Sequence, residues 1–347
     1  DLAVQAGIDP ANVTLVIGTG MHRPSTPAEI LELVGPAMLA ACNVVEHRAD
    51  VPATLVTVSE NPPVRVCRSF VEADFRIVTG LIEPHFMAGF SGGRKGVCPA
   101  LVDLATIQRF HGYDTLSDPR ADSGVLEGNP CHQIALDVAR QVGVDFLLNV
   151  AINQDRQLVG VYCGDLEQAH VSGCNAVAKW ARAEVETPYD LVVTCGGGYP
   201  LDQTLYQTVK GMCAALPALD SHGTLLQLSH CGEGIGSQPY RDLLLNYGQD
   251  WRRFLDDIRI RRDRTQLDQW EFQVQCRVLE RIGVTRLLLV TDGIEEDVLR
   301  RLALRPVLGA EPAVARAQHY LETFAATHPA GRVALIPDGP YTLVVHR

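Results

Sequence analysis

The sequence of 347 residues lacks several patterns that would assign it to well-known classes of protein. It has no excess of basic residues, and its formal net charge of -11 gives no electrostatic footprint for nucleic acid or an anionic membrane. It also has no apolar run of the length that spans a bilayer (about 18 residues) and no secretory signal peptide. These absences leave open a local basic pocket for a small anion.

Cysteine is present but not in the spacing of a metal or redox motif. None of the ten cysteines belongs to a Cys-x-x-Cys pair, which argues against a zinc ribbon or a thioredoxin-like site. A chain of 37.8 kDa can bury a large core and needs no disulfide framework. We therefore expect reduced, mostly buried thiols in a cytoplasmic protein of two domains.

The common nucleotide-binding patterns are also missing. The segment "EPHFMAGFSGGRKG" invites comparison with the Walker pattern, but Gly96 follows Lys95 where a hydroxyl residue is needed to hold magnesium. The segment "GTGMHR" after the first predicted strand lacks the third glycine of the dinucleotide motif. What remains is a small-residue loop whose amides can approach an anion. Lys95 is then a charge partner, a covalent anchor or a solvated loop lysine.

Strand-like and helix-like segments alternate through the chain, which predicts an α/β protein with largely parallel sheets. The apolar run "NVTLVIGTG" predicts a strand covered on both faces. Thr26, Pro27 and Glu29 predict a helix start, and Asn153–Arg156 predicts the turn of a hairpin. The segment "TPYD" marks a boundary between two α/β domains, residues 1–187 and residues 188–347.

Polar residues follow several predicted strands in the first half. His22 comes after one strand and His85 after another, and the carboxyl ends of parallel strands meet at one edge of a sheet. Imidazole is well suited to proton exchange near neutral pH, so the two histidines are candidate acid/base groups. His111 ends a predicted helix, where an interaction with the helix dipole explains it equally well.

The second half offers a candidate site for a carboxylate ligand. In "GGGYPLDQTLYQTVKG", Gln207 and Lys210 lie three residues apart and share a helix face with Tyr206 nearby. A solvated helix face is the alternative explanation. Trp270 is expected either to line an apolar pocket or to belong to the core. The segment "HCGEGIGS" predicts either a backbone anion nest or an ordinary turn.

Several of these motifs together resemble one family. They are "GTGMHRP", "IEPHFMAGFSGGRK", an "FHG" sixteen residues beyond the lysine, "GGYPLDQTLYQTVKG", "DQWE" and "IPDGPYT". In order and spacing they resemble the nickel-pincer lactate racemase family from about Val13 to Tyr341. The resemblance implies an active site at the interface of the two domains.

The resemblance also implies a cofactor. Lys95 would anchor a nickel-pincer nucleotide, a pyridinium-3-thioamide-5-thiocarboxylic acid mononucleotide that holds nickel between two sulfurs and a carbon. His111 would complete the square plane of the metal, a coordination reasonable for Ni(II). The further residues implied to bind the cofactor are Ser91, Gly92, Gly93 and Arg94. Enzymes that synthesise the cofactor are the implied partners.

The implied activity is racemisation or epimerisation of a small 2-hydroxy acid, lactate or a relative, through reversible hydride transfer. His22 and His85 would be the acid/base pair, one for each hand of the substrate. The residues implied to bind the substrate are Tyr206, Gln207, Lys210 and Trp270. Family members also carry an upstream segment of about eighty residues with an Asp-x-x-Arg motif. Nothing before His22 matches it, so we expect that a segment is missing before Asp1.

Two other functions remain open at this point. One is a metal-dependent hydrolase in which His22, His85 and His111 bind zinc, although their spacing does not follow a zinc motif. The other is a non-catalytic protein on the same scaffold that stores or carries the cofactor.

Overall fold

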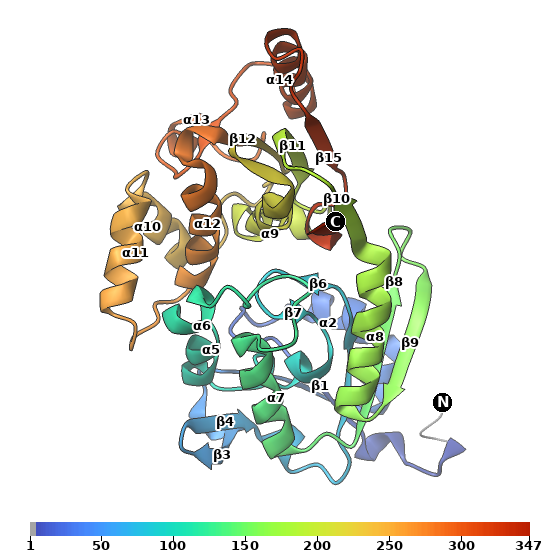
Figure 1. The fold of residues 1–347 in the computed structure, drawn as a ribbon. Coiled ribbons are helices and arrows are strands. Elements are labelled where there is room, and N and C mark those ends of the chain that lie inside the picture. Colours follow the sequence, from blue (N-terminus) through green and yellow to red (C-terminus); the bar gives the residue numbers. More distant parts are fainter. Residues whose placement is uncertain (1–4) are drawn as a thin grey trace. The chain divides into compact units, whose positions relative to one another are not determined.

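The computed structural model describes residues 5–347, which form two compact units (Figure 1). The first unit comprises the chain up to Ile82, Ser91–Phe110 and Cys131–Gly173, and the second comprises the rest. These units are not the contiguous ranges 1–187 and 188–347. Strand β10 (Arg182–Val185) pairs with β16 (Leu343–His346) at the end of the chain, which places it in the second unit.

The first unit is built on short sheets. Its strands are β1 (Thr14–Ile17), β2 (Asn43–Glu46), β3 (Leu55–Glu60), β4 (Pro63–Cys67), β5 (Ile77–Leu81), β8 (Phe146–Ile152) and β9 (Leu158–Gly164). Its helices are α2 (Pro27–Val34), α3 (Pro36–Ala41), α4 (Arg68–Val71), α5 (Leu104–Phe110), α7 (Pro130–Val142) and α8 (Leu166–Ala181), which continues into the second unit. Short 3-10 turns are η1 (Pro10–Asn12), η2 (Pro52–Thr54) and η3 (Gly93–Gly96).

The sheets of the first unit agree in part with the sequence predictions. Strands β5 and β8 are parallel, and β8 and β9 form the predicted antiparallel hairpin around Asn153–Arg156. Thr26 caps α2 as predicted, in a capping box with Glu29. The prediction that the first strand is covered on both faces is wrong, because among residues 5–347 β1 pairs only with β2 and none of the residues of β1 is fully buried.

The second unit contains the larger sheet. Its strands are β6 (Pro84–His85), β7 (Gly89–Phe90), β10, β11 (Tyr189–Cys195), β12 (Leu219–Leu228), β13 (Leu287–Val290), β14 (Arg305–Pro306), β15 (Val333–Ile336) and β16. Its helices are α6 (Tyr113–Ser117), α9 (Leu205–Ala215), α10 (Gln238–Tyr247), α11 (Trp251–Ile260), α12 (Gln269–Ile282), α13 (Glu296–Leu299) and α14 (Ala313–Thr327). Short turns are η4 (Leu201–Gln203), η5 (Leu216–Ala218), η6 (Val284–Arg286) and η7 (Gly339–Tyr341).

Five parallel strands form the main sheet in the order β14-β13-β12-β11-β15 (Figure 1). Helix α14 packs on the face that carries Leu191, Val193 and Leu226. Helices α9 and α12 pack against β11 and β12, where the intervening residues such as Val192 point the other way. The sheet is thus an α/β layer covered on both faces, in agreement with the predicted fold class.

The strand order reverses between β11 and β15, which marks a topological switch point. The loop after β11 begins the "GGGYP" motif, and the loop after β15 begins the "PDGPY" motif. The two loops are packed together: Cys195 Sγ lies 3.0 Å from Pro337 O, and a Cβ on Gly339 would lie 2.2 Å from Cys195 O. The first of these loops leads into α9, which carries Tyr206, Gln207 and Lys210.

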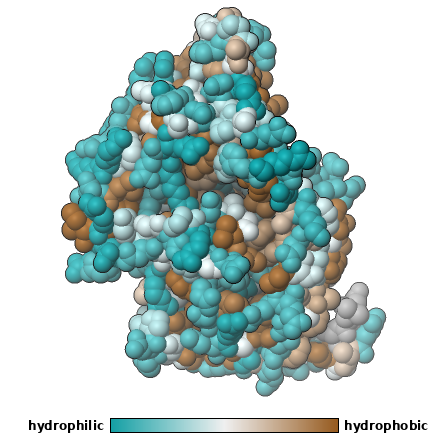
Figure 2. All heavy atoms as spheres, in the orientation of Figure 1, coloured by the Kyte–Doolittle hydropathy of each residue, from teal (hydrophilic) through white to brown (hydrophobic). Residues whose placement is uncertain are grey.

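The ten cysteines are all free thiols, and most of them are buried, as the composition predicts. Among the described residues, no helix is both long enough and apolar enough to span a membrane. Figure 2 shows hydrophobic residues dispersed among hydrophilic ones on the face that it displays.

Candidate active site

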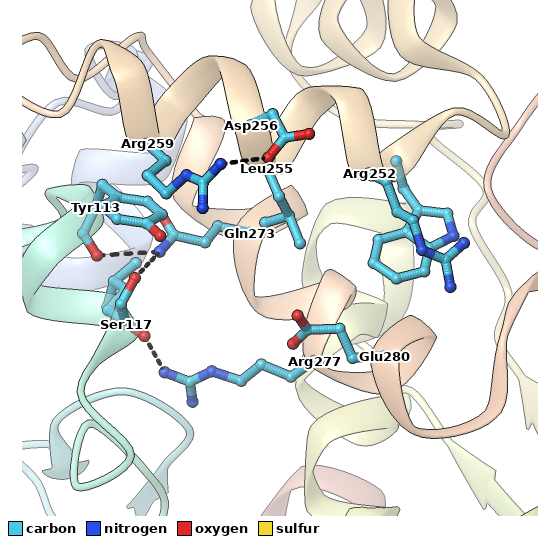
Figure 3. Close-up of a pocket in the computed structure, with 11 residues that line it drawn as sticks. Tyr113, Ser117, Arg252, Leu255, Asp256, Arg259, Gln273, Arg277 and Glu280 are labelled. Carbon is cyan, nitrogen blue, oxygen red and sulfur yellow. Dashed lines mark hydrogen bonds and ion pairs between the residues drawn. The ribbon is translucent and has the colours of Figure 1, made fainter.

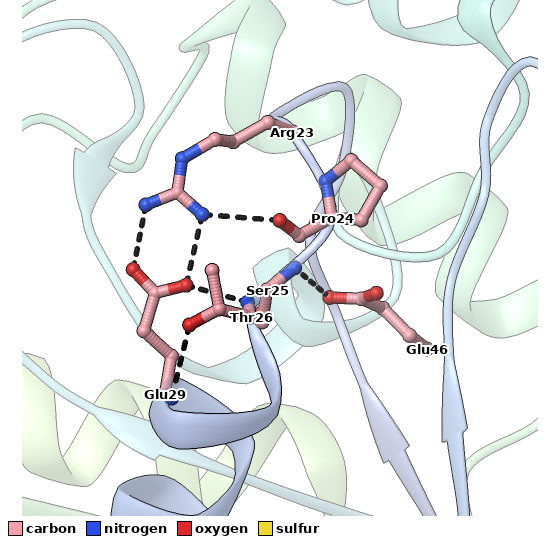
Figure 4. Close-up of polar contacts among 6 residues, drawn as sticks. All are labelled: Arg23, Pro24, Ser25, Thr26, Glu29 and Glu46. Carbon is pink, nitrogen blue, oxygen red and sulfur yellow. Dashed lines mark hydrogen bonds and ion pairs between the residues drawn. The ribbon is translucent and has the colours of Figure 1, made fainter.

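In the first unit, His22 lies on an exposed turn directly after β1. The turn is closed by a hydrogen bond from the His22 N–H to Thr19 O at 3.0 Å. The chain beyond it is held by Arg23, whose guanidinium binds both carboxylate oxygens of Glu29, and by the Ser25 N–H, which donates to Glu46 (Figure 4). Arg23 also lowers the pKa of the Glu29 carboxyl to about 2. His22 therefore lies beyond the end of β1, on a segment that hydrogen bonds hold both before and after the histidine.

Lys95 lies in the 3-10 turn η3, whose last residue packs on β5 of the same unit. The loop before it is hydrogen-bonded to the protein interior. Ser91 Oγ donates to Leu81 O at 2.7 Å, and the Gly93 N–H donates to Asn149 Oδ1 at 2.7 Å. Asn149 is fully buried in β8. The path of the chain into Lys95 is therefore defined by β5 and β8.

The glycines of this loop are required by packing against the protein. A Cβ on Gly93 would lie 2.5 Å from the ring of His170, and one on Gly92 would lie 2.7 Å from Asn149 Oδ1. Both glycines also have positive φ, 71° for Gly92 and 54° for Gly93. The space beside each Cα is therefore filled by side chains of β8 and α8.

Arg94 points into the interior of the first unit, where only 1% of its surface is exposed. Its Nη1 lies 3.0 Å from His170 Nε2, which is also 2.9 Å from Ser91 O. Burial and the neighbouring guanidinium lower the pKa of His170 to about 3. A neutral imidazole next to a buried guanidinium thus holds together the two ends of the Ser91–Arg94 segment.

In the second unit, His85 lies at the end of β6, in the tight hairpin that β6 forms with β7. The backbone N–H groups of Met87 and Ala88 donate to its Nδ1 at 3.3 and 3.2 Å. Because Nδ1 accepts these bonds, the neutral ring carries its proton on Nε2. Nε2 is then the nitrogen at which His85 can exchange a proton with a ligand.

His111 stacks on Trp270, with ring centroids 4.5 Å apart and planes inclined by 23°. The indole N–H of Trp270 donates to Tyr206 Oη at 2.8 Å, which connects the stack to α9. Trp270 is 2% exposed at the start of α12, so it is a core residue and a wall of the site at once. The orientation of the His111 ring is therefore set by a buried aromatic group of a helix far away in the sequence.

Lys210 and Gln207 supply unmatched polar groups on α9, as their spacing predicts. Lys210 is partly buried and its Nζ lies 5.9 Å above the ring of Phe86, but within the described part of the chain it forms no ion pair. Gln207 Oε1 is buried and has no hydrogen-bond partner there. An ammonium and an amide left without partners on one helix face suit a small ligand that bears a carboxylate.

Glu271, next to Trp270 on α12, sets the electrostatics around Lys210. Its side chain is 1% exposed, and its Oε1 has no hydrogen-bond partner among the described residues. Burial raises the pKa of this carboxyl, which Lys210 opposes. Burial likewise lowers the pKa of Lys210, which Glu271 and Glu83 oppose. A neutral Glu271 leaves the Lys210 charge available for an anionic ligand.

The loop His230–Ser237 is an ordinary turn rather than an anion nest. The N–H groups of His230 and Cys231 donate to Asp202, and that of Glu233 donates to Gln203. These donors are therefore already used by the protein.

The predicted site residues fall into two groups. The second unit holds His85, His111, Tyr206, Gln207, Lys210 and Trp270, and the first unit holds His22, Ser91, Gly92, Gly93, Arg94 and Lys95. Within the described residues no three His, Cys, Asp or Glu side chains are arranged to hold a metal ion. A zinc site built from three protein histidines therefore has no support in either unit.

Comparison with known proteins shows which family the chain belongs to. Residues 2–124 match the model of the lactate racemase N-terminal domain, and residues 185–344 match that of the lactate racemase C-terminal domain. The lactate racemase of Thermoanaerobacterium thermosaccharolyticum is 31% identical over 338 residues, which are 96% of this chain and 77% of that protein. The chain belongs to the lactate racemase family. It is an isomerase, a racemase.

Other relatives of this racemase support the assignment. The lactate racemase of Lactiplantibacillus plantarum is 32% identical over 333 residues, 95% of this chain and 76% of that protein. The solved lactate racemase apoprotein of T. thermosaccharolyticum superposes with a TM-score of 0.88 at 31% identity and covers 96% of this chain and 79% of its own. A Thermotoga maritima protein shares the fold alone, with a TM-score of 0.75 at 16% identity.

Each unit of this racemase offers one donor of the kind that the implied cofactor would need. Lys95 offers a primary amine at the end of a fixed turn, and His111 offers an imidazole whose ring is oriented by Trp270. One amine and one imidazole are what a tethered organic ligand that already holds its metal requires.

Sequence reasoning missed two buried residues of the racemase, Asn149 and His170. Asn149 interrupts the apolar strand "FLLNVAI", which was the visible signal of a buried polar contact. His170 lies within a helical segment of ordinary composition, so its contact with Arg94 has no local signature.

Proposed function

We propose that the protein interconverts the enantiomers of a small 2-hydroxy acid, with lactate as the first candidate, using a nickel-pincer nucleotide tethered to Lys95. Lys210 carries the proposal: it is an ammonium without an ion pair in the described structure, on the helix whose Tyr206 is hydrogen-bonded to the indole that stacks on His111. An anionic ligand would supply the ion pair that Lys210 lacks among the described residues.

In the proposed complex the protein binds and orients the substrate. Lys210 pairs with the carboxylate, and Gln207 and Tyr206 supply further hydrogen bonds from the same helix. Phe86 and Trp270, which are 5% and 2% exposed, form apolar walls that limit the size of the group on the substrate carbon. The namesake substrate of the curated relatives, lactate, carries only a methyl group there.

Lys95 would anchor the cofactor and His111 would bind its nickel. The chemistry that this cofactor supplies when bound is the reversible acceptance of a hydride from the substrate carbon. Direct contacts of Ser91, Gly92, Gly93 and Arg94 with the cofactor stay predictions. The interactions of the loop with Asn149 and His170 suggest that these four residues act by fixing the direction in which Lys95 leaves the backbone.

His22 and His85 would handle the hydroxyl proton, one for each enantiomer. For His85 the proton moves at Nε2, since Nδ1 faces the N–H groups of Met87 and Ala88. One histidine would take the hydroxyl proton from one enantiomer, and the other histidine would return a proton to the same oxygen when the opposite enantiomer is formed. Enzymes that make the cofactor are the partners that this proposal requires.

Chiral chromatography tests the proposal directly. Protein produced together with the cofactor-synthesising enzymes is incubated with single enantiomers of lactate, malate and larger 2-hydroxy acids. We expect at least one acid to reach an equal mixture of both hands, and we expect the intact mass to carry an adduct that is lost in Lys95→Ala. An adduct on the protein without isomerisation of any acid would point instead to a non-catalytic carrier. An adduct that persists in Lys95→Ala would contradict the anchor.

A further inference from the structure

One face of helix α12 contacts the segment that starts with His111. Trp270, Gln273 and Arg277 lie at positions i, i+3 and i+7, so they form a stripe along the helix. We call these three residues the α12 stripe. All of them, and residues 111–121, belong to the second unit.

The α12 stripe contacts this segment from its beginning to its end. Trp270 stacks on the ring of His111. The side-chain amide of Gln273 donates to Tyr113 O at 3.1 Å and to Ser117 Oγ at 3.3 Å. Nη1 of Arg277 donates to Ala121 O at 2.9 Å, and Nη2 donates to Leu116 O at 2.5 Å. One stacking contact and four hydrogen bonds therefore fix eleven consecutive residues to one helix.

The segment needs such support because it has little structure of its own. Helix α6 has five residues, and a helix of that length does not persist in isolation. The carbonyl groups at the end of a helix also lack partners within it, and Arg277 supplies the donor for one of them, Leu116 O. The guanidinium is a charged donor, which makes these bonds stronger than neutral ones.

One side of α6 faces a cavity that lies next to the α12 stripe. It has a volume of about 690 Å³ and is lined by Tyr113, Leu116 and Ser117 of α6, by residues of α11, and by Gln273 and Arg277 (Figure 3). On that side α6 is not packed closely against α11. Leu116 is buried and Asp114 pairs with Arg262, so the hydrogen bonds of the α12 stripe add direction to contacts that α6 already makes.

We infer that Gln273 and Arg277 are positioning residues for His111: they hold the segment behind it so that its ring stays against Trp270. The inference rests on the proposed role of His111 as the nickel ligand. Partners that orient a metal-binding histidine from outside the coordination sphere commonly affect metal affinity by about 10- to 100-fold.

Two measurements on the full chain test the inference. The first is hydrogen–deuterium exchange of peptides covering residues 111–121 in protein without cofactor. Exchange should be faster in Arg277→Met and Gln273→Leu than in the wild type, with a smaller change in Arg277→Lys, which keeps a charged donor. Glu280→Gln is the matched control, because Glu280 is exposed on the same helix and lines the same cavity. It should leave exchange unchanged.

The second measurement is the rate at which loaded protein loses nickel to a chelator. Arg277→Met should lose nickel about tenfold faster than the wild type, and Arg277→Lys by less. Unchanged exchange in Arg277→Met would overturn the inference. So would faster exchange without faster nickel loss, since Arg277 would then support the fold only. His111→Ala separates the two proposals: if it retains nickel as well as the wild type, the metal role of His111 fails, whatever the exchange shows.

Discussion

Nε2 of His170 lies 3.0 Å from a guanidinium nitrogen of Arg94, and both side chains are almost fully buried. The pair therefore contains one charge, because burial and Arg94 together keep the imidazole neutral and lower the pKa of His170 to about 3. Lys95 and His132, which also face His170, add to this effect. The loop that carries Lys95 thus depends on a histidine that cannot be protonated without a second buried positive charge.

This pair predicts that the protein loses stability in mild acid. The unfolded chain binds a proton at His170 below pH 6.5, whereas the folded protein does so only near pH 3, so unfolding takes up a proton in between. The free energy of unfolding should fall by about 2 kcal/mol from pH 7 to pH 5 on account of this residue. Urea titrations of His170→Gln should show a shallower dependence on pH. His319→Gln, at an exposed position, should keep the wild-type slope.

Lys210 is predicted to serve binding rather than stability. Since it has no ion pair in the described structure and is partly desolvated, Lys210→Met should leave the melting temperature unchanged or raise it. The same change should raise KM for a 2-hydroxy acid roughly 10- to 100-fold, the effect of losing a hydrogen bond to a charged group. Lys210→Arg should recover part of the affinity. If both variants lower the melting temperature and raise KM to the same extent, Lys210 is a structural residue.

The hydrogen bond between Trp270 and Tyr206 is predicted to couple α12 to α9. Tyr206→Phe leaves a buried indole N–H without a partner and should cost about 1–3 kcal/mol of unfolding free energy. Trp270→Phe removes the donor and keeps a ring against His111. The double variant should therefore be more stable than the sum of the two single changes predicts, by about 1 kcal/mol. Urea unfolding followed by far-UV circular dichroism measures all four proteins, and strict additivity would contradict the coupling.

Local patterns predicted local structure correctly. The hairpin around Asn153–Arg156 is encoded by its turn and flanking strands, and the cap of α2 by Thr26 and Glu29, each within a few residues. The shared face of Gln207 and Lys210 follows from helical periodicity alone. These predictions needed no knowledge of distant residues.

Contacts between distant parts of the chain were beyond such reasoning. Trp270 and His111 are 159 residues apart, and nothing near either one specifies the stack. The pairing of β10 with β16 likewise depends on the whole path of the chain between them, and the ranges expected for the two domains did not include it. The packing of the glycines before Lys95 could not be predicted, because their neighbours Asn149 and His170 lie 56 and 77 residues beyond Gly93.

Those glycines give the final prediction, which separates backbone strain from steric overlap. Gly35 and Gly93 both have positive φ, 78° and 54°, but a Cβ on Gly35 would have no neighbour within 4 Å. Gly35→Ala should therefore cost only the backbone term, about 1–3 kcal/mol of unfolding free energy, because φ 78° with ψ 153° is a conformation that essentially only glycine adopts. Gly93→Ala should cost about 1–3 kcal/mol more, because its Cβ would lie 2.5 Å from the His170 ring.

The clash at Gly93 should also affect the function proposed for Lys95, since the ring can make room only by leaving Arg94 and Ser91. We expect a smaller fraction of Gly93→Ala protein to carry the cofactor adduct by intact mass, at a temperature where the variant is folded. Gly35→Ala should load as the wild type does. If both variants lose the same stability and load equally, then the packing of Gly93 against His170 does not determine how the loop presents Lys95.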